Sequence, residues 1–190
     1  SALAALGVKA GDRVALLLPN CPQFFVAELA AWKLGGIVAP MNPIYSAEEH
    51  EGPMRTTGAR VVVTLSAFYE RMKQVQKKVG VQHVVSTNIK DYLPPLLRIV
   101  FTLAVEKKGG HRVTLRDSDP TMKALLKAHA GRRPTVARPK PDDDALFLMS
   151  GGTTGTPKAV RVHHGGLVQT GMQVQSWLAR ALPVWTGVYC

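Results

Sequence analysis

Short apolar runs alternate with longer segments of helical periodicity along the first half of the chain. The apolar runs are nearly continuous, which is typical of parallel strands buried on both faces. The segments between them place apolar residues at helical spacing and close in glycine, a common helix terminator. Strands are predicted at residues 11–20, 37–43, 59–64 and 83–87, and helices at residues 22–36, 46–58 and 66–80. This alternation predicts an α/β fold with an open, doubly wound and mostly parallel sheet flanked by helices.

The helix predicted at 46–58 carries two local signals of opposite effect. Ser46 and Glu49 have the spacing of a capping box, which favours a helix start. Gly52 and Pro53 follow within the same helix, and proline removes a backbone donor. We therefore expect a well-defined start and a disturbed second half.

The middle of the chain departs from the alternating pattern. Residues 93–110 contain an apolar stretch that is followed by Lys107 and Lys108. Such a stretch could form an interfacial helix that lies on a membrane. A short core helix is the favoured interpretation, because the stretch is below the length of a membrane span.

A helix and a linker are predicted after that stretch. Residues 118–130 have helical periodicity, with Ser118 or Asp119 as the cap and Pro120 in the first turn. Residues 131–144 are rich in proline, arginine and lysine and show no periodicity, which indicates an exposed linker.

Several side chains that could carry chemistry are interpreted as structural. The isolated histidines have no other metal-ligating residues near them in the sequence, and the cysteine starts a helix that is expected to be buried. The aromatic residues have the spacing of core residues. The residues interpreted as structural are Cys21, Phe24, Phe25, Trp32, His50, His83, His111 and His129. His163 and His164 lie on a predicted strand, where they would face opposite sides and would not form a metal site.

The composition restricts the classes of partner. The 190 residues include 24 basic and 13 acidic ones, and the net charge of +11 favours an anionic partner such as a nucleotide or an acidic membrane. Nucleic acid is disfavoured, because only 6% of the residues are aromatic and no reading motif is present. A basic module that binds anions or membranes is one alternative for the function.

Two cysteines and the absence of a signal peptide predict a cytoplasmic protein, with contact on the inner face of a membrane as an option.

The stretch LFLMSGGTTGTPKAV, residues 146–160, contains glycines, serine and threonine hydroxyl groups, and one lysine between two predicted strands. Glycines let a ligand approach the amides closely, and successive free N–H groups make a concave anion site. A lysine supplies a point charge that suits phosphate. The spacing fits neither the NTPase P-loop nor the dinucleotide motif. A loop that binds a polyphosphate is therefore predicted, and a turn rich in small residues is the alternative. The predicted phosphate-binding residues are Ser150, Gly151, Gly152, Thr153, Thr154, Gly155, Thr156, Pro157 and Lys158.

These residues resemble the phosphate loop of the adenylate-forming, AMP-binding enzymes. That loop has the pattern Tyr/Phe-Thr/Ser-Ser/Gly-Gly-Thr-Thr-Gly-x-Pro-Lys-Gly-Val, and residues 149–160 match it as MSGGTTGTPKAV. Two glycines before TTG are similar to long-chain fatty-acid–CoA ligases. Residues 6–63 and 90–109 are also similar to the N-terminal portion of those acyl-CoA synthetases. The departures are Met149 in place of an aromatic residue, Ala159 in place of glycine, and His163 with His164 in place of Thr-His.

The resemblance implies an acid–thiol ligase that activates a carboxylic acid with ATP as an acyl-adenylate and then transfers it to coenzyme A. An aryl-CoA ligase or an adenylation domain is the alternative within the family. The acidic residue that holds Mg²⁺, the ribose-binding aspartate and the catalytic lysine of the family have no counterpart in the chain, so no catalytic residue is assigned.

We therefore expect a fragment of the large N-terminal domain of an acyl-CoA synthetase-like fold. The first residue is Ser1, and SALAALG has the character of the end of a helix. Residues 1–92 are expected to form part of a first α/β subdomain. Residues 93–144 would be a helical insertion and a basic linker, and residues 145–190 part of a second subdomain with the phosphate loop. The chain alone is expected to be inactive and to self-associate, because its sheet would have unpaired edges and exposed apolar surface.

Overall fold

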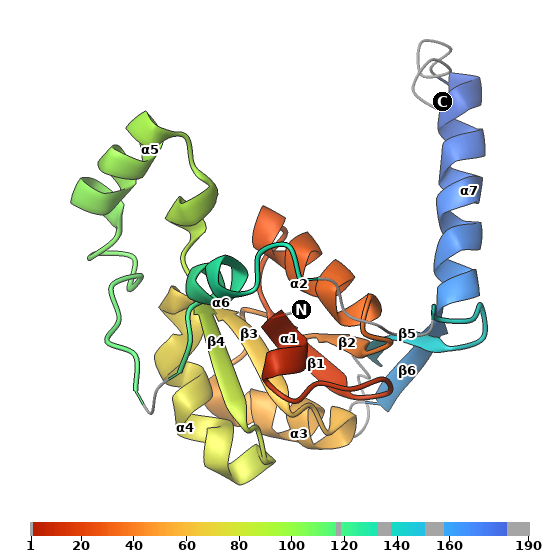
Figure 1. Cartoon of the computed structure of the whole chain (residues 1–190), viewed down its shortest axis with the longest axis horizontal. Helices are drawn as coiled ribbons and strands as arrows, with labels where there is room; N and C mark the ends of the chain where they lie inside the picture. The colour runs from red at the N-terminus through yellow and green to blue at the C-terminus, as the bar shows by residue number, and fades with distance from the viewer. Residues whose placement is uncertain (1, 117–118, 133–137, 151–157, 182–190) are drawn as a thin grey trace.

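A six-stranded sheet forms the centre of the computed structural model, which describes residues 2–116, 119–132, 138–150 and 158–181 (Figure 1). Its strands are β1 (Arg13–Leu17), β2 (Ile37–Pro40), β3 (Val61–Leu65), β4 (His83–Thr87), β5 (Asp144–Ser150) and β6 (Lys158–His163). The strand order is β4-β3-β1-β2-β5-β6. The first five strands are parallel to one another, and β6 is antiparallel to β5. The prediction of a doubly wound, mostly parallel sheet is confirmed.

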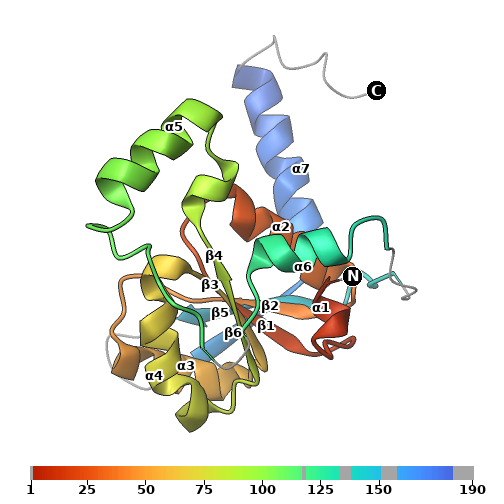
Figure 2. The same ribbon diagram turned by 60° about the vertical axis from the view of Figure 1, so that its left-hand side comes forward.

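Helices cover both faces of the sheet (Figures 1 and 2). One face carries α1 (Ala2–Ala5), α2 (Pro22–Trp32) and α6 (Met122–Ala128), and the other carries α3 (Ala47–Thr57) and α4 (Tyr69–Val79). A hydrophobic core lies on each face of the sheet, and alternate side chains of β1 pack in one core or the other, since successive residues of a strand point to opposite faces. Val14 and Leu16 pack in the core under α2, whereas Ala15 and Leu17 pack in the core over α3 and α4. The near-continuous apolar strands of the sequence are explained by this burial on both faces.

The capping box of α3 forms as the sequence predicts. The backbone N–H of Glu49 donates to the hydroxyl of Ser46 over 3.3 Å, and the N–H of Ser46 donates to the Glu49 carboxylate over 2.7 Å. The predicted disturbance at Gly52-Pro53 is wrong, because α3 runs unbroken to Thr57. The buried side chains of Pro53 and Met54 pack under the sheet, and this burial offsets the one backbone hydrogen bond that proline removes.

The segment after β4 is not part of either core. A short 3₁₀ turn, η2 (Ile89–Tyr92), leads into α5 (Pro95–Val100), which continues as the single π-helical turn η3 (Phe101–Val105). No residue from 95 to 105 is buried, and the side chains of Leu96 and Leu103 are 73% and 81% exposed. The favoured prediction of a core helix is therefore wrong. Both faces of the sheet are already covered by other helices, and α5 projects from the layers (Figures 1 and 2).

The start of α6 also differs from the prediction. Its cap is Thr121, whose hydroxyl accepts from the N–H of Ala124 over 3.0 Å, and Pro120 lies before the helix. Asp119 instead accepts a 2.8 Å hydrogen bond from the buried Tyr69 hydroxyl and forms a 2.8 Å ion pair with Lys73. A long-range ionic contact has therefore replaced the local cap. Ser118 lies outside the described residues.

Four of the eight residues interpreted as structural are buried or pack against the core. Cys21 and His50 are buried, and Phe24 and Trp32 pack against the core under α2. Phe25 is an exception, because it is 58% exposed on α2.

A further 3₁₀ turn, η1 (Ser66–Phe68), precedes α4, and α7 (His164–Ala181) follows β6. None of the helices within the described ranges has the length and apolarity to cross a membrane.

Candidate functional site

Parallel strand direction brings the candidate phosphate loop to the edge of the sheet where ligands bind in open α/β folds. Strands β1 to β5 run the same way, so their carboxyl ends share one edge. Ser150 is the last residue of β5 and therefore lies at this edge. In open α/β sheets the crevice outside the carboxyl ends is the usual ligand site. The fold thus gives Ser150 the position that a ligand-binding loop requires.

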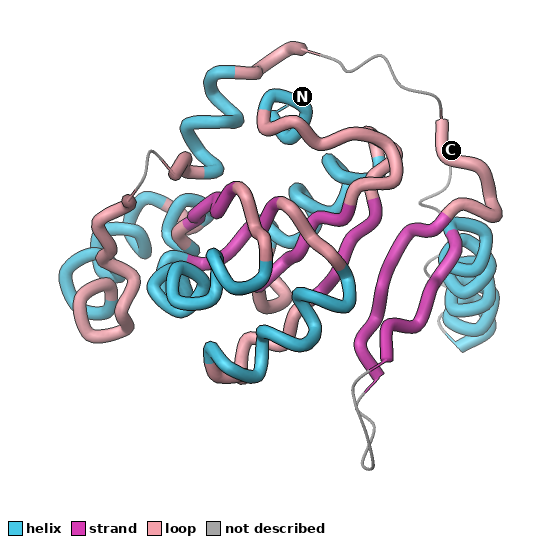
Figure 3. Tube along the Cα trace, turned by 90° about the horizontal axis from the view of Figure 1, so that it is seen from below, coloured by secondary structure: helices cyan, strands magenta, loops and turns pink. Residues whose placement is uncertain are grey.

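The strands β5 and β6 bring together the two ends of the predicted loop. Ser150 is opposite Lys158 in the antiparallel register, and the Lys158 N–H donates to the Ser150 hydroxyl over 3.4 Å. Figure 3 shows the two strands side by side at one margin of the sheet. Of the nine predicted phosphate-binding residues, these two are described. The other seven lie outside the described residues: Gly151, Gly152, Thr153, Thr154, Gly155, Thr156 and Pro157.

The exposed side chain of Lys158 is suited to an anionic ligand. Lys158 begins β6 at the carboxyl edge of the sheet, and the Ser150 hydroxyl opposite it is half-buried. No carboxylate of the described residues forms an ion pair with the Lys158 ammonium. The pair therefore offers one cation and one hydroxyl at the mouth of the loop, which is the chemistry that phosphate oxygens accept.

An ionic contact fixes the opposite end of the β5–β6 pair. The guanidinium of Arg161 donates from Nε to both carboxylate oxygens of Asp144 over 3.0 Å, and its terminal nitrogen lies 2.9 Å from the same group. This hydrogen bonding, together with the carboxylate charge, raises the pKa of Arg161 above its ordinary value. His163 Nε2 lies 3.5 Å from the Asp144 carboxylate. The contact joins Asp144, the first residue of β5, to Arg161 and His163 in β6, and so adds a side-chain link to the backbone pairing of the two strands.

The two adjacent histidines do not face opposite sides of one strand, as the sequence had suggested. His163 is the last residue of β6, but His164 is the first residue of α7, because the chain turns into a helix at this point. The His164 ring lies edge-on to Trp32, with centroids 5.6 Å apart. Within the described ranges no group of three or more acidic, histidine or cysteine side chains could hold a metal ion.

Two side chains that the sequence did not single out as site residues shape the loop after β2, at the same edge of the sheet. The Arg71 guanidinium donates to the carbonyl groups of Pro43 and Tyr45 over 2.7 and 2.6 Å. The ring nitrogens of His50 lie 2.6 and 3.1 Å from two further carbonyl oxygens of this loop. The Arg71 contacts span 28 and 26 positions of the sequence, and both side chains bind backbone carbonyls, so no sequence motif predicts these contacts.

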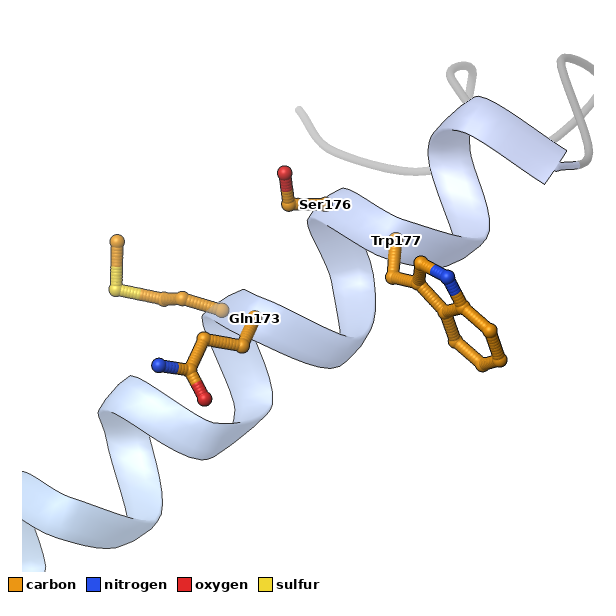
Figure 4. A pocket seen from close by; sticks show the side chains of 4 residues that line it. Gln173, Ser176 and Trp177 are labelled. Atoms are coloured by element: carbon orange, nitrogen blue, oxygen red, sulfur yellow. The ribbon is translucent and has the colours of Figure 1, made fainter.

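A shallow depression on α7 is not a second site. Its four lining side chains, Met172, Gln173, Ser176 and Trp177, all belong to one helix (Figure 4). The depression is open to solvent, and among the described residues only side chains of α7 line it. It lacks the enclosure of a small-molecule pocket.

Comparison with known sequences identifies relatives of the whole chain. The profile of the AMP-binding enzyme family matches residues 1–189. A long-chain-fatty-acid–CoA ligase from Bacillus subtilis is 30% identical over 173 residues, which cover 90% of the chain and 31% of the relative. A ligase of the same name from Escherichia coli O6:H1 is 34% identical, with the same coverage. A 4-coumarate–CoA ligase from Pinus taeda is 34% identical and covers 88% of the chain. The chain therefore spans 31% of the length of the first two relatives.

Solved structures give the same result for the fold. A long-chain-fatty-acid–CoA ligase from Archaeoglobus fulgidus superposes with a TM-score of 0.69 at 25% identity, over 92% of the chain and 29% of the ligase. An acyl-CoA synthetase from Brucella canis superposes with a TM-score of 0.66 at 26% identity, over 91% of the chain and 27% of the synthetase.

Proposed function

The chain belongs to the AMP-binding enzyme family, and on that premise we propose that it works as the phosphate-binding part of an AMP-forming acid–thiol ligase. The proposed reaction begins with attack of a carboxylate on the α-phosphate of ATP, which gives an acyl-adenylate and pyrophosphate. The thiol of coenzyme A then displaces AMP. The observation that carries the proposal is the position of Ser150 and Lys158, which lie opposite each other at the carboxyl edge of the sheet and flank the glycine-rich loop.

The proposed role of residues 150–158 is to hold the β- and γ-phosphates, which become the leaving pyrophosphate. The Lys158 ammonium would neutralise charge that develops on the leaving group, and the hydroxyls and amides of the loop would orient it. Neither task requires covalent chemistry. This fits the exposed position of the lysine.

The proposed substrate is a long-chain fatty acid, which is converted to its coenzyme A thioester. The relatives from Bacillus subtilis and Escherichia coli are named as ligases of long-chain fatty acids, and the paired Gly151 and Gly152 are similar to those ligases. The relative from Pinus taeda, named as a ligase of 4-coumarate, supports an aryl acid as the alternative.

Magnesium and coenzyme A enter the proposal only through the family. The described residues do not fit a metal site, since no three of their acidic, histidine or cysteine groups gather. Mg²⁺ would supply charge neutralisation for the phosphates, and its acidic ligand is expected beyond these residues. The proposed compartment is the cytoplasm, where ATP and coenzyme A are both present.

Carboxylate-dependent exchange of pyrophosphate with ATP tests this function. The assay is run on this chain and on the full-length product of its gene, with short, aryl and long-chain acids. We expect exchange in the full-length protein alone, strongest with long-chain acids. Strongest exchange with aryl acids would select the alternative substrate. If no acid supports exchange in either sample, the ligase proposal fails and a basic anion-binding module takes its place.

A further inference from the structure

An apolar arm extends from the body of the molecule at residues 95–105, which comprise α5 and the π-helical turn η3. Both views show α5 away from the sheet and from the helices that cover it (Figures 1 and 2). Six large apolar side chains of the arm are between 43% and 81% exposed: Leu96, Leu97, Ile99, Val100, Leu103 and Val105. Single exposed apolar residues are ordinary, but a contiguous group of this kind marks an interaction surface.

The polar side chains of the apolar arm form hydrogen bonds with the arm and with the segment that leads into it. Residues 95–105 contain two polar side chains, Arg98 and Thr102. The Arg98 guanidinium donates to the carbonyl groups of Lys90 and Asp91, over 3.1 Å in each case. The Thr102 hydroxyl donates to the Arg98 carbonyl over 2.8 Å. Because these bonds replace bonds to water, transfer of the arm out of water costs less.

A polar clamp holds the base of the apolar arm to the body. The buried Glu106 carboxylate forms a 2.6 Å ion pair with Lys90 and accepts a 3.3 Å hydrogen bond from the Asn88 side chain. The Phe101 ring lies edge-on to His111, with centroids 5.2 Å apart, and His111 in turn contacts the Ser66 hydroxyl over 3.3 Å. The apolar side chains are therefore presented in a fixed direction.

The base of the apolar arm is positively charged. Lys107 and Lys108 directly follow the arm and are both exposed. Between residues 90 and 116 the chain has six basic and two acidic residues, and the whole chain has a net charge of +11. An exposed apolar tip above a cationic base complements a lipid surface that has anionic headgroups over an apolar interior.

The distribution of the apolar side chains around the helix distinguishes lipid from a protein groove. A groove covers one face of a helix, with anchors spaced at i, i+3, i+4 and i+7. In the apolar arm, Leu96, Ile99, Val100 and Leu103 have this spacing and form one face, but Leu97 lies about 100° from Leu96 around the helix and is 53% exposed outside that face. A lipid layer surrounds an inserted helix, and so covers all of these side chains.

We propose that the apolar arm docks the protein on an anionic membrane by inserting into one leaflet, with Lys107 and Lys108 at the headgroups. Eleven helical residues span about 16 Å, which is short of the roughly 30 Å of a bilayer core. The arm therefore anchors at the interface and does not cross. This proposal stands on residues 88–111 and does not depend on the ligase function.

Sedimentation with vesicles tests the proposal on this chain and on the full-length protein. The vesicles contain phosphatidylcholine alone or with one third phosphatidylglycerol. The arm variant is Leu96→Ser with Leu103→Ser, and its matched control is Val168→Ser with Trp177→Ser on α7, where both side chains are also exposed. We expect binding to the anionic vesicles that falls at least tenfold in the arm variant and is retained in the control. Lys107→Ser with Lys108→Ser should weaken binding to anionic vesicles and reduce its dependence on salt.

Three results would overturn the proposal. The first is an absence of binding, or equal loss in the arm variant and the α7 control, when both keep the wild-type midpoint of urea unfolding. The second is binding by this chain but not by the full-length protein, which would mean that other parts of the protein cover the apolar arm. The third is a change in oligomeric state in the arm variant without a change in vesicle binding, which would assign the arm to contact between copies of the chain.

Discussion

The indole N–H of Trp32 donates a 2.9 Å hydrogen bond to the backbone carbonyl of Ala145. This bond joins the last residue of α2 to the second residue of β5, which are 113 positions apart in the sequence. The register between β2 and β5 contains one pair of residues, Val38 and Leu146. The Trp32 side chain therefore adds a long-range hydrogen bond between the first βα units and the strands that flank the candidate phosphate loop.

Replacement of Trp32 by phenylalanine should destabilise the chain by about 1–3 kcal/mol, because the Ala145 carbonyl loses its donor while the ring remains. The free energy of urea unfolding measures this cost. Trp177→Phe is the matched control, since Trp177 is 73% exposed on α7, and should change stability by less than about 0.5 kcal/mol. Equal stability of the two variants would show that the bond contributes nothing to the fold.

Replacement of Lys158 by alanine should reduce pyrophosphate exchange in the full-length enzyme on the order of 10²-fold or more, because a charge that stabilises the leaving pyrophosphate is removed. The unfolding free energy should change little, since Lys158 is exposed. Lys77→Ala on the exposed side of α4 is the control and should keep full exchange. Normal exchange in the Lys158 variant would remove this residue from the site.

Replacement of Asp119 by alanine should cost about 3–5 kcal/mol, because it removes the carboxylate from a buried ion pair with Lys73. Both side chains of this pair are less than a tenth exposed, and the carboxylate also accepts from the Tyr69 hydroxyl. The exposed ion pair of Glu70 with Arg116 gives the comparison, and Glu70→Ala should cost less than about 1 kcal/mol. The midpoints of urea unfolding rank the two variants, and similar midpoints would contradict the structural role of Asp119.

The stability of the chain should fall as the pH decreases below about 6.5, the ordinary pKa of histidine. Burial lowers the pKa of His50, and this effect outweighs the carbonyl groups of Ser46 and Asn42, which pull the pKa upward. The unfolded chain therefore binds the proton more readily than the folded chain, so stability is constant above the unfolded pKa and is lost below it. His111, whose pKa burial also lowers, contributes in the same direction.

Unfolding free energies measured between pH 5 and pH 8, for the wild type and for His50→Asn, isolate the contribution of His50. The variant should show a shallower loss of stability on acidification, whatever its stability at pH 8. Identical pH slopes in the two proteins, or a wild type that gains stability in acid, would mean that His50 is charged in the folded state.

Self-association of this chain should depend on α7. Several of its large apolar side chains are exposed, among them Val168, Met172 and Trp177, and such surface favours association in water. Replacement of Met172 and Trp177 by serine should shift the mass measured by light scattering toward that of a single chain. An unchanged mass would place the contact elsewhere, and the variant Leu96→Ser with Leu103→Ser then tests the apolar arm.

Local sequence signals predicted most of the central fold. The apolar runs located the strands, and β4 begins and ends at the predicted residues, 83 and 87. Ser46 and Glu49 located the start of α3. The family inferred from residues 149–160 is confirmed by a profile that matches residues 1–189. These features could be predicted because each depends on neighbours in the sequence, such as a continuous apolar run or a cap three residues from its partner.

Two of the errors have a common physical cause, since each depends on contacts that are distant in the sequence. The apolar stretch at 95–105 was assigned to the core because apolarity alone does not reveal whether a face of the sheet is still uncovered. Asp119 was assigned as a helix cap, but the side chains of Tyr69 and Lys73 bind it instead. The loop contacts of Arg71 and His50 are made with backbone carbonyls, which no residue type specifies.

The single registered pair between β2 and β5 also affects how the molecule opens. Amide groups of β1 and β3, which share four registered pairs, should exchange with solvent at rates set by global unfolding. Those of β5 and β6 should exchange faster, since their link to β2 is short. The β5–β6 pair is then a separate unit of local stability. It can shift while the first four strands stay intact, so that Ser150 and Lys158 move together relative to the rest of the sheet.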